Sequence, residues 1–262
     1  MPQCLTPKIV LLLLLCSLTA HAQLPDCEHI YLKKLNDEGV YNYNPTLPVS
    51  ATNPVKNTIS IPESFGLTVS HVLGSDPSVL TFYSVELSSG NYIYYDPVSK
   101  DWLNTRHKTG SPYAVNIAAG GKYIFNLDGV NGKVYRYDGT QPEVLITTVS
   151  DFVGGAPYDL VTDCEGNWYI LNLRSTTPFL RKYNAEGTLL HSWVIYNPSG
   201  ISVESGAGFA IIGTNLYTDN TATGGGITLY SMGKDTVEVL RTTSDNVLSV
   251  GDDLGCCAGN VP

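Results

Sequence analysis

The feature that most constrains the fold is a dipeptide, tyrosine followed by aspartate or asparagine, that recurs along the chain. It occurs at Tyr43-Asn44, Tyr95-Asp96, Tyr137-Asp138 and Tyr183-Asn184, with Tyr230-Ser231 as a weaker fifth copy. Successive copies are 52, 42, 46 and 47 residues apart. Each interval holds about four short runs of β-branched and aromatic residues bounded by turn formers. Repeats of this length and content are typical of the blades of a β-propeller.

The best-defined copy spans residues 157–193. It begins with Pro157 and a short apolar run, turns at Gly166 and continues in a strand around Trp168. Two further strands are predicted over residues 179–184 and 189–195, with a turn at Gly187 between them. A single sheet of this kind leaves apolar side chains uncovered, so we expect the copies to stack on one another.

A short apolar strand opens each copy, at residues 65–69, 113–117, 158–162, 199–203 and 246–250. The last of these is followed by too few residues for three more strands. Residues 28–34, 39–44 and 57–62 have the pattern of second, third and fourth strands with no first strand before them. We therefore predict that one blade combines a first strand at residues 246–252 with these three, which removes the free edges of the ring.

The predicted fold class is all-β, a five-bladed β-propeller in one domain over residues 23–262. A six-bladed arrangement stays open because the segment 44–60 is long. The other predicted strands cover residues 80–86, 92–96 and 102–105 in the second blade, 122–127, 134–138 and 144–149 in the third, and 209–218, 227–231 and 237–243 in the fifth.

The first 22 residues predict export. Lys8 precedes an apolar run, and Ala20-His21-Ala22 forms a small-residue cleavage site, as in a secretory signal peptide. The expected location is therefore extracellular or at the cell surface. The chain has 15 basic and 24 acidic residues and a net charge of −9. Loss of Lys8 with the signal makes this −10, which disfavours nucleic acid as a partner.

Four cysteines follow the signal peptide: Cys27, Cys164, Cys256 and Cys257. An exported protein can form disulfides, and the cysteine spacing does not match a zinc site. Cys27 precedes a second strand just as Cys164 does in its own copy, and the predicted first strand for Cys27 ends shortly before Cys256. We therefore predict a disulfide between Cys27 and either Cys256 or Cys257, with Cys164 outside it. A vicinal bridge between Cys256 and Cys257 is the alternative.

Residues 157–163, Gly166-Asn167-Trp168-Tyr169 and Leu180-Arg181-Lys182-Tyr183-Asn184 with Gly187 resemble the repeat of NHL-type β-propellers. The signal peptide, Asp26-Cys27 and the strand at Ile30-Tyr31 also resemble the start of the N-terminal propeller of secreted surface proteins of Bacteroidota. That resemblance implies a binding or scaffold module that can form part of a larger adhesin.

The sequence lacks the common motifs of catalytic sites. It contains no nucleophile elbow, phosphate-binding loop or paired-histidine zinc motif, so we expect no catalytic residue, no cofactor and no metal. The enzymatic alternative is a metal-dependent lactonase of the gluconolactonase type, whose axial cation needs several carboxylate and amide oxygens. At the corresponding first-strand positions only Asp159 and Asn246 supply such oxygens.

Aromatic residues favour a binding function instead. Phe65, Tyr113 and Tyr158 open three successive first strands, where they would surround one mouth of the central channel. Asp159 follows directly. Aromatic rings offer flat apolar area to a ligand. We therefore predict a glycan or a cell-surface protein as the partner, bound at these four residues. The alternative is that the three rings pack between blades.

Overall fold

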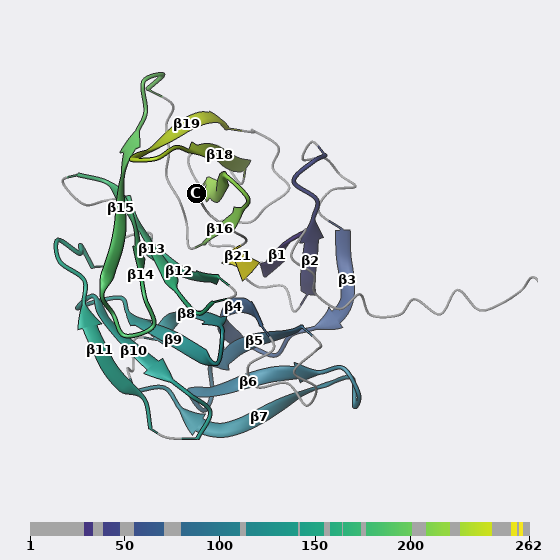
Figure 1. The fold of residues 1–262 in the computed structure, drawn as a ribbon. Coiled ribbons are helices and arrows are strands. Elements are labelled where there is room, and N and C mark those ends of the chain that lie inside the picture. The colour runs from purple at the N-terminus through teal and green to yellow at the C-terminus, as the bar shows by residue number, and fades with distance from the viewer. Residues whose placement is uncertain are drawn as a thin grey trace, which may run out of the picture.

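In the computed structural model every regular element is a β-strand within the described residues, which are 29–33, 39–47, 55–70, 80–110, 114–140, 142–154, 158–163, 165–173, 177–200, 208–220, 226–242, 253–255 and 257–258. Only the backbone is described at residues 114–115, 158, 220, 242, 253–255 and 257–258. The strands group into antiparallel four-stranded units arranged around a common centre (Figure 1).

We name the units I to V. Unit I contains β20 (Asp253–Gly255), β1 (Ile30–Lys33), β2 (Gly39–Tyr43) and β3 (Val55–Ser60). Unit II contains β4 (Ser64–Ser70), β5 (Thr81–Glu86), β6 (Asn91–Asp96) and β7 (Asp101–Lys108). Unit III contains β8 (Ala114–Gly120), β9 (Tyr123–Asp128), β10 (Lys133–Tyr137) and β11 (Val144–Thr148).

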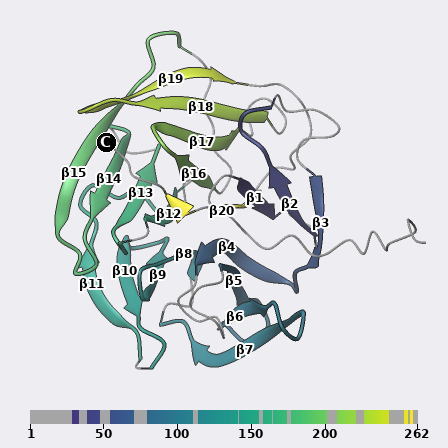
Figure 2. The same cartoon turned by 45° about the vertical axis from the view of Figure 1, so that its right-hand side comes forward.

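Unit IV contains β12 (Tyr158–Asp163), β13 (Trp168–Asn172), β14 (Phe179–Tyr183) and β15 (Leu189–Tyr196). Unit V contains β16 (Phe209–Ile212), β17 (Asn215–Asn220), β18 (Gly226–Met232) and β19 (Thr236–Thr242). The outer strands β15 and β19 pair in parallel and join units IV and V into one sheet, to which β21 (Cys257–Ala258) adds at the inner edge of β12. Figure 2 shows β4, β8, β12 and β16 on the inner side of the ring.

The innermost strand of unit I comes from the end of the sequence, as predicted, but it lies a few residues later than expected. It is β20, whose Leu254 pairs with Leu32 of β1. The predicted residues 246–252 lie outside the described part of the chain. Two residues beyond β20 the chain pairs with unit IV, where the backbone of Cys257 is in register with Thr162.

Unit V differs from the sequence prediction. Residues 209–218, expected to form a single second strand, form a hairpin in which Ile212 of β16 pairs with Asn215 of β17. Gly213 makes the turn with φ of +59°, a conformation that glycine adopts without steric cost. Among the described residues the innermost strand of unit V is β16. Of the predicted first strand at residues 199–203, Ser199 lies in the turn after β15, and residues 201–203 lie outside the described part.

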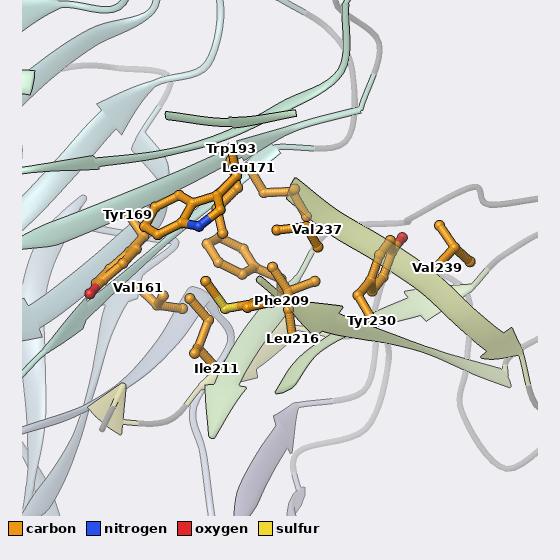
Figure 3. Packing of buried hydrophobic residues seen from close by; sticks show 12 residues of the cluster. Val161, Tyr169, Leu171, Trp193, Phe209, Ile211, Leu216, Tyr230, Val237 and Val239 are labelled. Atoms are coloured by element: carbon orange, nitrogen blue, oxygen red, sulfur yellow. The ribbon is translucent and has the colours of Figure 1, made fainter. Parts of the chain in front are cut away.

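The hydrophobic core is divided among the contacts between units. Figure 3 shows the cluster between units IV and V, where Trp193 and Tyr169 of one unit face Phe209 and Leu216 of the other. Four further clusters of described residues lie between I and II, II and III, III and IV, and V and I. Each unit thus shares one cluster with each of two neighbours, as stacked sheets with two apolar faces require.

The repeated dipeptide has two structural roles. Its tyrosines are buried at the third strand of each unit: Tyr43, Tyr95, Tyr137, Tyr183 and Tyr230. The Asp or Asn that follows forms an Asx turn, accepting a backbone hydrogen bond from the residue two positions later. These acceptors are the Oδ1 atoms of Asn44, Asp96, Asp138 and Asn184, with N···O distances of 2.9, 3.2, 2.9 and 3.1 Å.

Neighbouring innermost strands are joined by threonine side chains. The backbone N–H of Ala119 in β8 donates to Oγ1 of Thr68 in β4 at 3.0 Å. The carbonyl of the same residue accepts a hydrogen bond from Oγ1 of Thr162 in β12 at 2.5 Å. Both threonines are buried, so these bonds satisfy backbone groups that no sheet ladder pairs between units.

We predict that Thr162→Val lowers the free energy of unfolding by about 1–3 kcal/mol, because the similar shape leaves the Ala119 carbonyl buried without its donor. Urea denaturation measures the change. Thr148→Val, the same substitution at an exposed position of β11, is the matched control and should have little effect. Equal midpoints for the two variants would contradict the structural role of Thr162.

Candidate functional site

Phe65 is the exposed residue of an otherwise buried innermost strand. In β4 its neighbours are buried, while Phe65 itself is 39% exposed. A bulge in the pairing of β4 with β5, between Phe65 and Thr68, places it there. Gly66 within the bulge has φ of +67°. The hydroxyl of Ser84 donates its single hydrogen in a shared bond to the carbonyls of Phe65 and Gly66, with O···O distances of 3.0 and 2.5 Å, which holds the bulge in place.

Unit III has a bulge at the same place in its innermost strand, between Ala114 and Asn116 of β8. Bulges redirect side chains and are frequent next to binding sites. Tyr113, predicted at this position, lies outside the described residues, and Tyr158 is described by its backbone alone. Their participation with Phe65 in one site therefore stays a prediction.

Asp159 is buried and joins two units. Its Oδ1 accepts from the N–H of Leu160 at 2.7 Å, and its Oδ2 accepts from the N–H of Phe209 in β16 at 3.1 Å. The side chain is 8% exposed. These contacts give Asp159 a structural role between units IV and V, whereas its predicted role in ligand binding stays a prediction.

A carboxylate that the sequence analysis did not single out lies between units II and III. Glu143, just before β11, accepts hydrogen bonds from the hydroxyl of Tyr92 in β6 and from the N–H of Gly110 beyond β7. Nδ2 of Asn126 in β9 also donates to it, at 3.3 Å. Tyr92 stacks on Tyr137 of unit III at 5.2 Å, so the polar contact has an aromatic neighbour.

Burial raises the pKa of Glu143 to about 7, although the N–H of Gly110 acts in the opposite direction. Burial likewise raises the pKa of Tyr137 to about 12. The hydroxyl of Tyr137 and Oδ1 of Asn126 are buried without a hydrogen-bond partner among the described residues. The sequence offered no signal for this cluster, because Tyr92 and Gly110 lie 51 and 33 residues from Glu143.

Other acidic residues at the ends of strands have turn or packing roles. Burial acts to raise the pKa of Asp128, but hydrogen bonds from the side chain of Asn131 and from the N–H groups of Val130 and Asn131, together with Lys133, lower it overall. Asp163 forms an ion pair with Lys182 at 3.0 Å. Across the described residues no three His, Cys, Asp or Glu side chains are grouped so that they could hold a metal ion.

Three comparisons with known proteins bear on the fold. No protein-family model matches the sequence, and no curated protein matches it. Among solved structures, the chain is similar to one from the crystal structure of a nidogen/laminin complex, with a TM-score of 0.51 and 15% sequence identity. The match covers 86% of this chain and 97% of the other. It supports a β-propeller-like fold, in agreement with the ring of four-stranded units.

The sequence resemblance to Bacteroidota surface proteins is not supported by these comparisons. The predicted disulfide partners Cys27 and Cys256 lie outside the described residues, as does Cys164, and Cys257 is described by its backbone alone. The described residues contain no helix that is long and apolar enough to cross a membrane.

We predict that Glu143 stabilises the wild-type protein most below about pH 4.5 and that its contribution falls as the pH rises to about 7. The folded-state pKa of Glu143 lies above its ordinary value of 4.5, so folding favours the protonated carboxyl. The contribution of Glu143 to the free energy of unfolding is fully present below about pH 4.5 and is lost as the pH rises through the folded-state pKa of about 7. It amounts to at most about 3 kcal/mol.

Glu143→Gln keeps the shape and removes the titration, so this part of the pH dependence should disappear. Urea denaturation at several pH values measures it. Glu238→Gln, at an exposed carboxylate of β19, is the control that should retain the wild-type pH dependence. An unchanged slope in Glu143→Gln would show that other groups cause it.

Proposed function

We propose that the chain is an exported, non-catalytic, five-bladed β-propeller that binds a glycan or a cell-surface protein. Units I to V are its blades, and the mouth of the ring at which β4 begins is its binding face. The predicted signal peptide supports export, and the resemblance to NHL-type repeats supports the assignment of the units as blades. A part in a larger adhesin rests on the resemblance to Bacteroidota surface proteins alone.

Two observations support five blades. Each of the five apolar clusters joins a different pair of units, and the pairs run from I and II round to V and I. The hairpin β16–β17 gives unit V its own inner strand, so no unit lacks one. A sixth blade would have to lie between two units that already share a cluster.

The exposure of Phe65 is the observation that carries the binding proposal. An exposed aromatic ring leaves unused the free energy that its burial would provide, and a ligand that covers the ring would gain it. The bulge and the two hydrogen bonds of Ser84 fix that ring outside the core. The similar chain comes from a complex of nidogen with laminin, which supports a protein as one kind of partner.

We predict that Phe65→Ala abolishes or strongly weakens binding while leaving the fold intact. The wild-type protein is first titrated against an array of microbial, plant and animal glycans and against immobilised extracellular matrix proteins. The best probe is then titrated against the variant, with at least a tenfold loss of affinity expected for a central aromatic contact. Because the ring is partly exposed, the free energy of unfolding should change by less than about 1 kcal/mol.

Val98→Ala is the matched control, because Val98 is 80% exposed in the turn between β6 and β7. It should bind as the wild type does. A large loss of stability in Phe65→Ala would assign the ring to packing and contradict the proposed site. Hydrolysis of a simple lactone by the wild-type protein, lost with a chelator, would replace the binding proposal with the metal-dependent lactonase.

A further inference from the structure

The outermost strand of unit II ends in three basic side chains. Arg106, His107 and Lys108 are consecutive and all exposed at the end of β7. Among the described residues no Asp or Glu forms an ion pair with them. Two unneutralised cations and an imidazole at one place are unusual in a chain with 24 acidic and 15 basic residues.

The backbone presents these residues on a fixed bulge. Asn91 pairs with Lys108 and Ile93 with Asn104, so a single residue of β6 faces three of β7. Arg106 has φ of +63°, which is strained for a residue other than glycine. Its N–H donates to Oδ1 of Asn104 at 2.7 Å. The bulge is therefore a defined structure within the strand.

Side chains from both strands and from unit III hold the bulge. Oγ1 of Thr105 donates to the carbonyl of Tyr92 at 2.8 Å and accepts from the N–H of His107 at 3.2 Å. The ring of His107 lies 5.2 Å from that of Tyr137. Because these contacts already order the bulge in the free protein, little conformational entropy of the bulge would be lost when a ligand binds.

The nearby carboxylates have other partners. Glu86 accepts from Ser89 and from Nδ2 of Asn104, and Glu143 accepts from Tyr92 and Gly110. Glu63 is the exception, since it is exposed next to Phe65. Hydrogen bonds from neutral donors leave the charge of a carboxylate in place, so Glu63 and Glu86 offset part of the positive charge of Arg106 and Lys108. The two cations are nonetheless exposed and form no ion pair among the described residues.

This basic bulge lies at the same end of its sheet as Phe65. Ser64 pairs with Glu86 at the end of β5, and Asn91 at the start of β6 pairs with Lys108. Three strand spacings separate β4 from β7, or about 14 Å. A ligand a few sugar units long can span that distance.

We propose that the ligand is an acidic polysaccharide that lies across this end of unit II. A sugar ring packs on Phe65, and carboxylate or sulfate groups contact Arg106, His107 and Lys108. This inference rests on the proposed function, because it names the chemical class bound at the face that contains Phe65. Acidic polysaccharides combine apolar ring faces with regularly spaced anions, which matches an aromatic ring and a basic bulge on one sheet.

The test compares two substitutions that make the same kind of chemical change at opposite ends of the sheet. Arg106→Gly removes a cation and a positive-φ strain at the basic bulge. Lys100→Gly removes a cation and the same strain at the other end of the sheet, since Lys100 is exposed with φ of +58° in the turn between β6 and β7. Both variants should fold at least as stably as the wild type, because glycine relieves the strain.

Polygalacturonate and heparin are the anionic probes, and dextran is the neutral one. We expect saturable binding of an anionic probe that weakens when salt is raised from about 50 to about 500 mM. Arg106→Gly and Lys108→Gln should each lower affinity about three- to fivefold, while Lys100→Gly leaves it unchanged. Glu63→Gln should strengthen binding.

Four results would overturn the proposal. Equal losses in Arg106→Gly and Lys100→Gly would indicate non-specific charge attraction. Equal affinity for duplex DNA or for vesicles of anionic lipid would indicate a general polyanion surface. If a neutral glycan or a protein binds, and loses affinity in Phe65→Ala but not in Arg106→Gly, the binding function stands and the acidic ligand is wrong. Aggregation of the Arg106 and Lys108 variants with unchanged affinity would assign the cations to protection of a sheet edge.

Discussion

The structure depends on the burial of two apolar faces on every four-stranded unit. A sheet in this chain has no helix to cover it within the described residues, so neighbouring sheets must do so. Trp168 illustrates the arrangement, because it stacks on Tyr183 of its own unit at 4.2 Å and lies 6.2 Å from Phe125 of unit III. A unit deprived of one neighbour would expose such rings to water. The pairing of β20 with β1 is therefore as important as any sheet contact, since it completes unit I, which combines strands from the two ends of the sequence.

The candidate site residues divide into polar side chains that hold the ring together and side chains that remain exposed outside it. Thr68, Thr162 and Asp159 bind backbone groups of the neighbouring innermost strand, and Glu143 joins units II and III. In contrast, Phe65 and the basic bulge of β7 are exposed on backbone irregularities that side-chain hydrogen bonds hold in place. Bulges at such positions interrupt a ladder and redirect side chains, which is a reason to look for ligands there rather than at the buried acids.

Most strands were predictable because the repeated dipeptide has one residue that packs between units and a second residue that forms the turn at the end of the strand. Tyr183 fills the space between units while Asn184 ends the strand, so one motif fixes both the period and the strand boundary. The hairpin of unit V was missed because residues 209–218 are apolar on both sides of Gly213, and one glycine does not separate a turn from a strand. The Glu143 cluster and the bulge at Arg106 depend on pairing register and on residues far apart in sequence, which no local pattern contains.

The most direct test of the closed ring is hydrogen–deuterium exchange on the chain with and without residues 253–262. A chain lacking only residues 259–262 is the control, because it keeps β20 and β21. If the ring is closed by β20, its deletion should remove protection from the amides of β1. Protection should then also fall at the clusters that unit I shares with units II and V. Undiminished protection of β1 in the shortened chain would contradict closure by the end of the sequence.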